Sequence, residues 1–374
     1  MIPLFKVAMS DSAPKLVEEV LRSGYVGQGP KVEEFEGALA ARIGNANLAT
    51  VNSATSGLHL ALHLVAGGAG DDRDGGEVLT TPMTCTATNW PILANGLRLR
   101  WVDVDPATLN VDLDDLARKI SPATRAIVVA HWAGYPVDLD RLRQVLDRAE
   151  QTYGVRPMVI EDCAHAWGAT YRGLPLGNHG NITVFSFQAI KHLTCGDGGL
   201  MVLPNDELRR RARLLRWYGI DRDSKSRFPF MDDIAEYGFK FHMNDISASI
   251  GLANLEHVDE IVHRHRRNAA YFDAELSGVP GLELTERSPD REPSFWIYTI
   301  KVEDRPGFMS RMDEAGVMAS PVHQRNDVFS CVRDYACVLP GLDSVSERMV
   351  SIPVGWWLSE DDRAHIVSTI KAGW

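Results

Sequence analysis

Residues 158–203 read MVIEDCAHAWGATYRGLPLGNHGNITVFSFQAIKHLTCGDGGLMVL. The stretch contains three apolar runs of strand length, Met158–Asp162, Thr183–Phe187 and Leu200–Leu203. The first run ends in acids, and the second is followed by Lys191 and a glycine-rich loop. Apolar strands that end in polar residues are typical of an α/β sheet whose ligands gather beyond the carboxyl ends of its strands.

The same pattern continues toward the N-terminus. Four further runs are predicted strands: Leu48–Val51, Val78–Thr81, Leu97–Val104 and Ala126–His131. Amphipathic segments of helical length lie between strands, for example Ser56–Ala66 and Asp138–Thr152. Alternating strands and helices predict a mostly parallel sheet with helices on both faces. No GxGxxG motif follows the first strand, so the sequence does not indicate dinucleotide binding.

The pattern changes after Pro204. Helices are predicted at Asp206–Tyr218, Asn244–Phe272, Pro306–Ala315 and Ser359–Ile370, and a strand is predicted at Trp296–Val302. The Gly- and Asp-rich stretch Gly67–Gly76 is predicted to be an exposed loop. We therefore expect a large domain over residues 1–245, with an N-terminal helical segment, and a long connecting helix with a small C-terminal α+β domain over residues 246–374.

Composition narrows the class of protein. The chain has 374 residues, is 45% hydrophobic and carries a net charge of −11, which argues against nucleic acid as a partner. The apolar runs are far shorter than the roughly 18 residues of a membrane span, and the N-terminus lacks the features of a signal peptide. We expect a cytoplasmic protein with no membrane partner. Its five cysteines match neither a disulfide framework nor a zinc spacing, so free thiols and no metal site are expected.

Three strand ends carry residues suited to one chemistry. The turn Asn52–Gly57 opens a helix, where backbone N–H groups with the Thr55 and Ser56 hydroxyls would bind an anion; a simple capped turn is the alternative. A carboxylate at a buried strand end, Asp162, requires a cation. Lys191 follows the next strand, although a lysine there is more often a surface charge. An amine, a carboxylate for a pyridinium nitrogen and a phosphate cradle are what pyridoxal 5′-phosphate (PLP) requires from a protein.

Six motifs in a shared order extend this reasoning. They are SGYVGQGPKVEEFE (23–36), NSATSGLHLAL (52–62), TPMTCTATNWPILANG (81–96) with WVDVDPATLNVD (101–112), IEDCAHAWGA (160–169), FSFQAIKHLTCGDGG (185–199) and GFKFHMNDISASIGLANL (238–255). With these motifs the chain resembles, over nearly its whole length, the DegT/StrS-type sugar aminotransferases. These are fold-type I PLP-dependent enzymes that aminate nucleotide-linked ketosugars.

The resemblance implies a set of cofactor-binding residues. Lys191 would bond covalently to PLP, Asp162 would face the pyridinium nitrogen and His165 would lie near the phenolic oxygen of the ring. The phosphate would be bound by hydroxyls of Thr55, Ser56 and Ser186. Lys240 takes a position that reaches the cofactor phosphate of the neighbouring subunit, which implies a homodimer with shared active sites.

Several positions depart from the family or stay open. Cys85 replaces an aromatic residue that stacks on the cofactor in many relatives, and Trp90 is the candidate substitute. His242 replaces a frequent Arg or Asn, without an assigned role. His323 and Arg325 follow a strand-like run, residues 319–322, in the region that the family uses near the substrate. A guanidinium suits a diphosphate, while a solvated surface arginine is the alternative for Arg325.

The expected function is a PLP-dependent aminotransferase that converts a nucleotide-linked keto-deoxysugar to the aminosugar, with glutamate as the amino donor. A sugar 3-dehydratase of the same family is disfavoured because it carries His where this chain has Lys191, although His192 is adjacent. Two other hypotheses stay open: a non-nucleotide substrate such as a cyclitol, and a non-catalytic sensor of PLP or a sugar nucleotide. The nucleotide (GDP, UDP or dTDP), the sugar and the aminated carbon, C3 or C4, are open as well.

Overall fold

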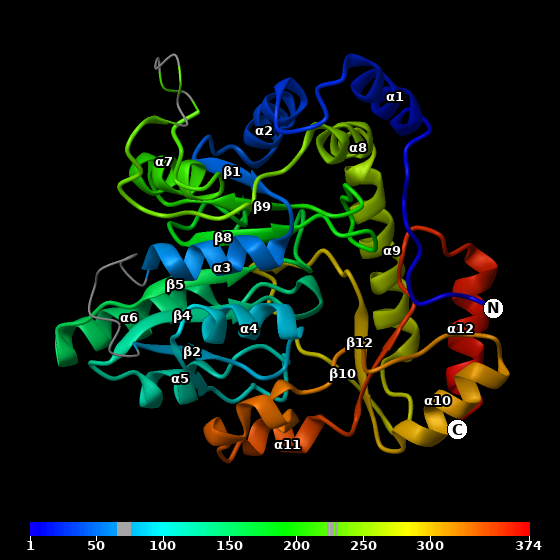
Figure 1. Ribbon diagram of the computed structural model, residues 1–374. Helices are drawn as coiled ribbons and strands as arrows, with labels where there is room; N and C mark the ends of the chain where they lie inside the picture. Colours follow the sequence, from blue (N-terminus) through cyan, green and yellow to red (C-terminus); the bar gives the residue numbers. More distant parts are fainter. Residues whose placement is uncertain (66–75, 223, 225–227, 229–230) are drawn as a thin grey trace.

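The computed structural model describes residues 1–65, 76–222, 224, 228 and 231–374 (Figure 1). Except for Gly76, the predicted loop at 67–76 lies outside these residues. A seven-stranded sheet with the order β1-β9-β8-β5-β4-β2-β3 forms the centre. Its strands are β1 (Leu48–Val51), β2 (Glu77–Thr80), β3 (Arg98–Trp101), β4 (Thr124–Ala130), β5 (Met158–Asp162), β8 (Ile182–Ser186) and β9 (Gly199–Val202).

Every strand of this sheet except β9 runs in the same direction, because β9 pairs antiparallel with both of its neighbours. The predicted mostly parallel sheet is therefore confirmed, and all seven predicted strands are present. Only the run Leu97–Val104 was predicted too long. The chain leaves the sheet after Trp101, and Val104 instead forms a local bridge with Val111.

Side-chain alternation along the strands explains the two helical layers. On β4, Ile127 and Val129 belong to one buried cluster, while Ala126 and Val128 belong to the cluster on the opposite face. Helices that contribute to the first cluster include α2 (Pro30–Ile43), α5 (Leu113–Lys119), α6 (Leu139–Tyr153) and α8 (Asp245–Leu255). Those of the second include α3 (Ala54–Val65), α4 (Thr86–Ala94) and α7 (Asp206–Leu215).

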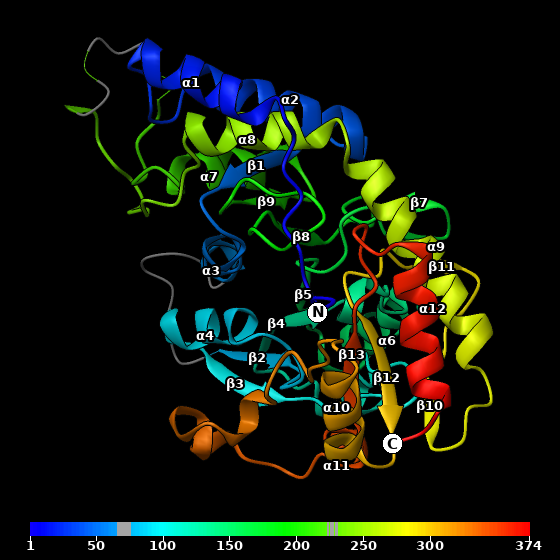
Figure 2. The same cartoon turned by 90° about the vertical axis from the view of Figure 1, so that its right-hand side faces the viewer.

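The single long helix predicted over Asn244–Phe272 is wrong. Asn244 does cap a helix, since its side-chain oxygen accepts the N–H of Ser247 at 2.8 Å, but α8 ends at Leu255 and α9 (Val258–Leu276) follows. The two helices have different neighbours: α8 packs against α1 (Ala13–Ser23) and α2, whereas α9 begins in the first cluster and goes on to contact C-terminal elements. Figure 2 shows α9 descending from α8 to lie beside α12 (Glu360–Lys371).

A smaller three-stranded sheet, β10-β12-β13, organises the C-terminal third. Its strands are β10 (Leu282–Leu284), β12 (Tyr298–Val302) and β13 (Met349–Ile352), and they share a third buried cluster with α9, α10 (Arg305–Glu314) and α12. The strand-like run 319–322 is not a strand, because Ser320 makes only an isolated bridge with Ser351. A second small sheet, of order β11-β6-β7, consists of β6 (Thr170–Tyr171), β7 (Leu174–Pro175) and β11 (Arg291–Glu292).

The N-terminal residues join this C-terminal part, since Ile2 pairs with Val317 and packs against the third cluster. The division at residues 245 and 246 stays a prediction. Short helical segments complete the described chain: η1 (Trp132–Gly134), η3 (Asn326–Val328), η4 (Ser330–Tyr335) and α11 (Pro340–Val345). Among the described residues, none of the helices combines the length and apolar character that crossing a bilayer requires.

Candidate active site

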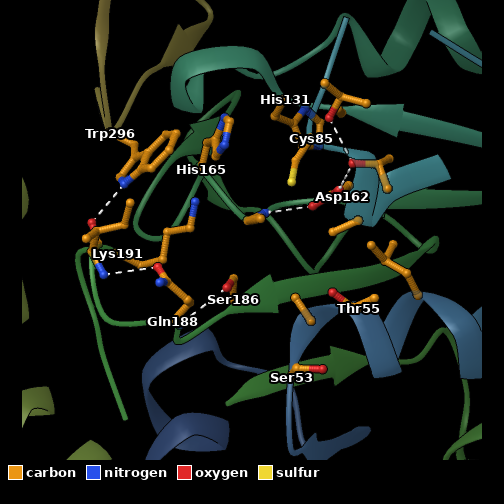
Figure 3. A pocket seen from close by; sticks show the side chains of 18 of the residues that line it. Ser53, Thr55, Cys85, His131, Asp162, His165, Ser186, Gln188, Lys191 and Trp296 are labelled. Carbon is orange, nitrogen blue, oxygen red and sulfur yellow. Dashed lines mark hydrogen bonds between the residues drawn. The ribbon is translucent and has the colours of Figure 1, made fainter. Parts of the chain in front are cut away.

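A cavity of about 300 Å³ lies beyond the carboxyl ends of β4, β5 and β8, beside the N-terminus of α3 (Figure 3). This is the edge at which open α/β sheets bind ligands. Its polar and aromatic lining residues come from seven separate segments: Ser53, Thr55, Thr84, Cys85, Thr88, His131, Asp162, His165, Ser186, Gln188, Lys191, Asp197, Trp296 and His323. The parallel sheet brings most of these segments together because its strands end at a common edge, whereas Trp296 and His323 come from the C-terminal part of the chain.

Lys191 enters the cavity from the loop after β8. A turn bond from its N–H to the carbonyl of Gln188, 2.9 Å long, fixes the backbone, and the Nζ atom lies 3.4 Å from the centre of the Trp296 ring. Burial lowers the pKa of Lys191 to about 7, although the nearby charge of Asp162 opposes the shift. An amine with this pKa is about half deprotonated at neutral pH and can therefore act as a base.

The neighbouring His192 points away from the cavity. It is buried, and its Nε2 lies 3.1 Å from the carbonyl oxygen of Ser294. Lys191, and not the histidine beside it, therefore occupies the position from which covalent chemistry is possible. This register removes the structural basis for the dehydratase alternative.

Asp162 ends β5 and faces the same cavity. One carboxylate oxygen accepts the hydroxyl of Thr88 at 2.7 Å, and the other accepts the backbone N–H of Ala164 at 3.0 Å. Thr88 in turn lies 2.8 Å from the hydroxyl of Thr84. The carboxylate is 6% exposed and held in one orientation by these bonds, as a partner for a buried cation requires.

Three hydroxyl residues, Ser53, Thr55 and Ser186, line the end of the cavity at the first turn of α3, low in Figure 3. The N–H groups of a first helical turn lack intrahelical acceptors and favour an anion. A Cβ at Gly199 would lie only 2.7 Å from the backbone nitrogen of Ala54, so the close approach of β9 to this turn requires glycine. Ser56 does not line the cavity, because it accepts the hydroxyl of Ser53 at 3.0 Å.

Two histidines form an aromatic wall. The rings of His165 and His323 are parallel, with centroids 5.6 Å apart and an interplanar angle of 7°. Burial, followed by the charge of Lys191, lowers the pKa of His323 to about 4 and holds the pKa of His165 well below its usual range. Both rings are therefore neutral at physiological pH.

The remaining predicted residues lie outside the cavity. The guanidinium of Arg325 donates hydrogen bonds of 2.6 to 2.8 Å to the carboxylates of Asp327 and Asp343. These bonds give it a structural role in this chain. Lys240 is exposed and has its carbonyl bonded to the side chain of Asn52. His242 packs on the Trp217 ring at 3.7 Å.

The expected substitute for the missing aromatic at Cys85 is not supported. Trp90 packs edge-on against Phe329 and does not line the cavity, whereas Cys85 does. No motif pointed to Trp296 as a site residue, because it comes from the C-terminal part of the chain. Ser53, Thr88 and Gln188 were also missed, although each lies within or beside a motif that the sequence analysis singled out.

His131, Glu161 and Cys163 place three potential metal ligands within 4.8 Å of one another. Both nitrogens of the imidazole are already used, since Nδ1 accepts the N–H of Val137 and Nε2 lies 2.9 Å from Glu161. Burial by itself would raise the pKa of Glu161, but the hydrogen bonds and charges of His131, Asn181 and His179 together outweigh it and lower the pKa. Hydrogen bonding thus accounts for this cluster, and His131 is mainly a satisfied core histidine at the cavity wall.

The groups in the cavity fit PLP. They supply an amine, an oriented carboxylate and three hydroxyls beside a helix N-terminus, with a backbone approach at Gly199 that leaves no room for a side chain. An aldehyde, a pyridine nitrogen and a phosphate are the matching groups of the cofactor.

Comparison with known proteins agrees with this geometry. The sequence model of the DegT/DnrJ/EryC1/StrS aminotransferase family matches residues 8–371. The chain is 61% identical to the sugar aminotransferase CalS13 of Micromonospora echinospora, and the match covers 100% of both chains. It is 64% identical to AtS13 of Actinomadura melliaura, where the match covers 100% of this chain and 99% of that one. Both crystal structures superpose on this chain with a TM-score of 0.96.

A more distant neighbour, Spr1654 of Streptococcus pneumoniae, is 26% identical with a TM-score of 0.90, and the match covers 100% of this chain and 98% of that chain. Its structure has been determined in PLP and PMP forms. Together with the cavity, these likenesses confirm the fold and the cofactor expected from the sequence. The chain belongs to the DegT/DnrJ/EryC1/StrS aminotransferase family and is a PLP-dependent transaminase.

Proposed function

We propose that this transaminase transfers the amino group of glutamate to a nucleotide-linked keto-deoxysugar. The observation that carries the proposal is the convergence of Lys191, Asp162 and the hydroxyl end of the cavity in one buried space. The similarity to CalS13, named a sugar aminotransferase, supports a sugar as the acceptor. PLP, when bound, supplies a ring that withdraws electrons from the carbon that loses its proton.

In this proposal the side chains that line the cavity have separate tasks. Asp162, oriented by Thr88 and Ala164, would keep the ring nitrogen of the cofactor protonated. Lys191 would bond covalently to PLP at rest, and its Nζ, when free, would accept the proton from Cα of the amino donor and deliver it to the cofactor carbon. His165 would lie near the phenolic oxygen, and His323 would line the substrate side. The phosphate would be bound by Thr55 and Ser186, with Ser53 added to the predicted set.

The site is proposed to be shared between two subunits. Among the lining residues that the structure describes, Lys191 is the sole lysine or arginine, although both glutamate and a sugar nucleotide are anions. Lys240 is exposed and lies outside the cavity of its own chain, as a residue that serves a partner subunit must. Exposed apolar side chains at Met231 and Ile234 precede it, and such groups favour burial in an interface.

The test is a pair of half-reactions. Glutamate added to the yellow, PLP-loaded protein should bleach the visible absorbance and release 2-oxoglutarate, and a keto-deoxysugar linked to dTDP, UDP or GDP should restore the colour. Restoration by a keto-cyclitol alone would transfer the proposal to a non-nucleotide substrate. A PLP chromophore that does not respond to glutamate would instead support the sensor.

Replacement of Lys191 by Ala provides the control for chemistry at this position. The variant should lose turnover by at least about 10²–10⁴-fold, because it lacks both the covalent attachment and the base. The measurement is formation of 2-oxoglutarate in a single turnover. Appreciable transamination by the variant would contradict the assignment of Lys191.

A further inference from the structure

Trp296 brings an aromatic face to the amine of Lys191. The indole is buried, 3% exposed, and its ring centre lies 3.4 Å from Nζ, which is the closest ammonium–ring contact among the described residues (Figure 3). A cation is attracted to the negative face of an aromatic ring, most strongly to that of Trp. No part of the proposed chemistry so far uses this residue.

The indole is held in one orientation by four contacts. Its Nε1 donates to the carbonyl of Ile190 at 2.9 Å, and its backbone N–H donates to the carbonyl of Ala133 at 3.0 Å. Its ring stacks with Phe5 at 5.0 Å and 21°, and with His165 at 4.0 Å and 23°. Because Ile190 directly precedes Lys191, the ring is tied to the segment whose side chain it contacts.

The residues before Trp296 fix it further. The hydroxyl of Ser294 donates to the carbonyl of His165 at 2.9 Å, and its own carbonyl lies 3.1 Å from His192. Phe295 has a φ of 53°, in the left-handed region, while its carbonyl lies 2.7 Å from Nδ1 of the buried His265. Such a conformation is costly for a residue with a side chain and persists only where the surroundings enforce it.

We infer that Trp296 is a positioning residue that holds the amine of Lys191 over its indole face whenever that amine is not bonded to the cofactor. The inference rests on the proposed function, because transamination requires Lys191 to be released and to remain nearby between the two half-reactions. A released lysine has several rotatable bonds, and a ring with a fixed orientation restricts where its Nζ can lie.

Two effects follow from removing the ring. The ammonium form of Lys191 loses the attraction of the aromatic face, so its protonation equilibrium should fall by about 2-fold to 30-fold, which lowers its pKa by about 0.3 to 1.5. The freed amine also loses its fixed position, so proton transfer should slow by about 10-fold to 100-fold. Binding of the amino donor should change little, because the indole restrains the lysine.

The first test measures Lys191 directly. Full-length protein loaded with pyridoxamine 5′-phosphate, in which the lysine is free, is labelled with acetic anhydride over a range of pH, and acetylation of Lys191 is quantified by peptide mass spectrometry. The pKa of Lys191 should be highest in wild type, lower in Trp296→Phe and lowest in Trp296→Leu. An equal pKa in all three proteins, or a higher pKa in Trp296→Leu, would overturn the inference.

The second test separates binding from chemistry. In the overall reaction with glutamate and the keto-deoxysugar, both variants should lower kcat, while the KM for glutamate stays within about 2-fold of wild type. A rise in KM with unchanged kcat would overturn the positioning role. If wild-type protein loaded with PLP does not react with glutamate at all, the proposed function is wrong. If wild type reacts normally and the Trp296 variants react at the same rate, only the positioning role of Trp296 is wrong.

Matched variants guard against a general loss of structure. Trp101→Phe makes the same change at another buried tryptophan, on β3 and outside the cavity lining, and should leave the pKa of Lys191 at its wild-type value. Phe5→Ala removes the ring that stacks on Trp296 and should shift the pKa in the same direction by less. If Trp296→Leu does not fold, as judged by thermal unfolding, the same decision rests on Trp296→Phe and Phe5→Ala.

Discussion

The buried amine of Lys191 is required for the proposed chemistry but lowers the stability of the folded protein. In the unfolded chain its amine has an ordinary pKa of 10.5, whereas burial lowers the pKa to about 7 in the folded protein without cofactor. Between these two values the unfolded state binds more protons than the folded state, so folding becomes less favourable as pH falls from about 10.5 to 7. Below about 7 the full penalty remains.

Replacing Lys191 by Met should therefore stabilise the cofactor-free protein at neutral pH. The gain should be greatest at and below about pH 7 and should shrink by roughly 1.4 kcal/mol for each pH unit above it. Thermal unfolding of wild type and variant at pH 6.5, 8 and 9 measures the difference. Lys15→Met, on the exposed surface of α1, should show no such trend, and a pH-independent difference at Lys191 would contradict the prediction.

At the scale of elements, a helix can be capped from far along the chain. The N-terminus of α2 begins Gly29-Pro30 and has no side-chain cap of its own. The buried carboxylate of Asp245, at the start of α8, instead accepts the N–H groups of Gly29 at 2.8 Å, Val32 at 3.1 Å and Lys31 at 3.2 Å. One side chain thus joins two helices separated by more than 200 residues and complements the positive end of α2.

Asp245→Ala should destabilise the protein by about 1–3 kcal/mol, because it leaves three backbone donors of α2 without their acceptor. Asp245→Asn, which keeps one acceptor oxygen, should lose less. The midpoint of thermal unfolding measures both, with the exposed Asp313→Ala on α10 as a control. Equal midpoints for wild type and Asp245→Ala would show that the cap contributes nothing.

At the scale of the whole molecule, the active site is proposed to need a second copy of the chain. A subunit with Lys191→Ala has lost its own amine but still offers Lys240 to its partner. A subunit with Lys240→Ala has the opposite defect. In a mixed dimer with shared sites, one site combines both defects and the other has neither.

Mixing the two inactive variants under conditions that exchange subunits should therefore restore about a quarter of wild-type activity, because about half of the dimers are mixed and each has one intact site. Activity is measured as 2-oxoglutarate formed per subunit. If Lys240 serves its own chain, mixing restores nothing. Each variant incubated alone under the same conditions provides the baseline.

Much of the fold could be predicted because it depends on local signals. The bounds of β1 and β5 agree with prediction to the residue, and the other five strands of the large sheet shift or shorten at their ends. Buried parallel strands require short apolar runs, and the polar residues after them identify the edge at which a ligand binds. Lys191, Asp162, Thr55, Ser186, His165 and His323 were predicted on this basis or from the family resemblance, and all line one cavity.

Local patterns and motifs in the chain were enough to predict the α/β class, the strand ends that line the cavity and the family. The break between α8 and α9, the distant cap on α2 and the contact of Trp296 with Lys191 became visible only in the folded molecule. The break follows Asn254, whose buried side chain bonds to both Ser10 and Thr194. These features depend on contacts between segments that lie far apart in the chain, so no local periodicity or spacing encodes them.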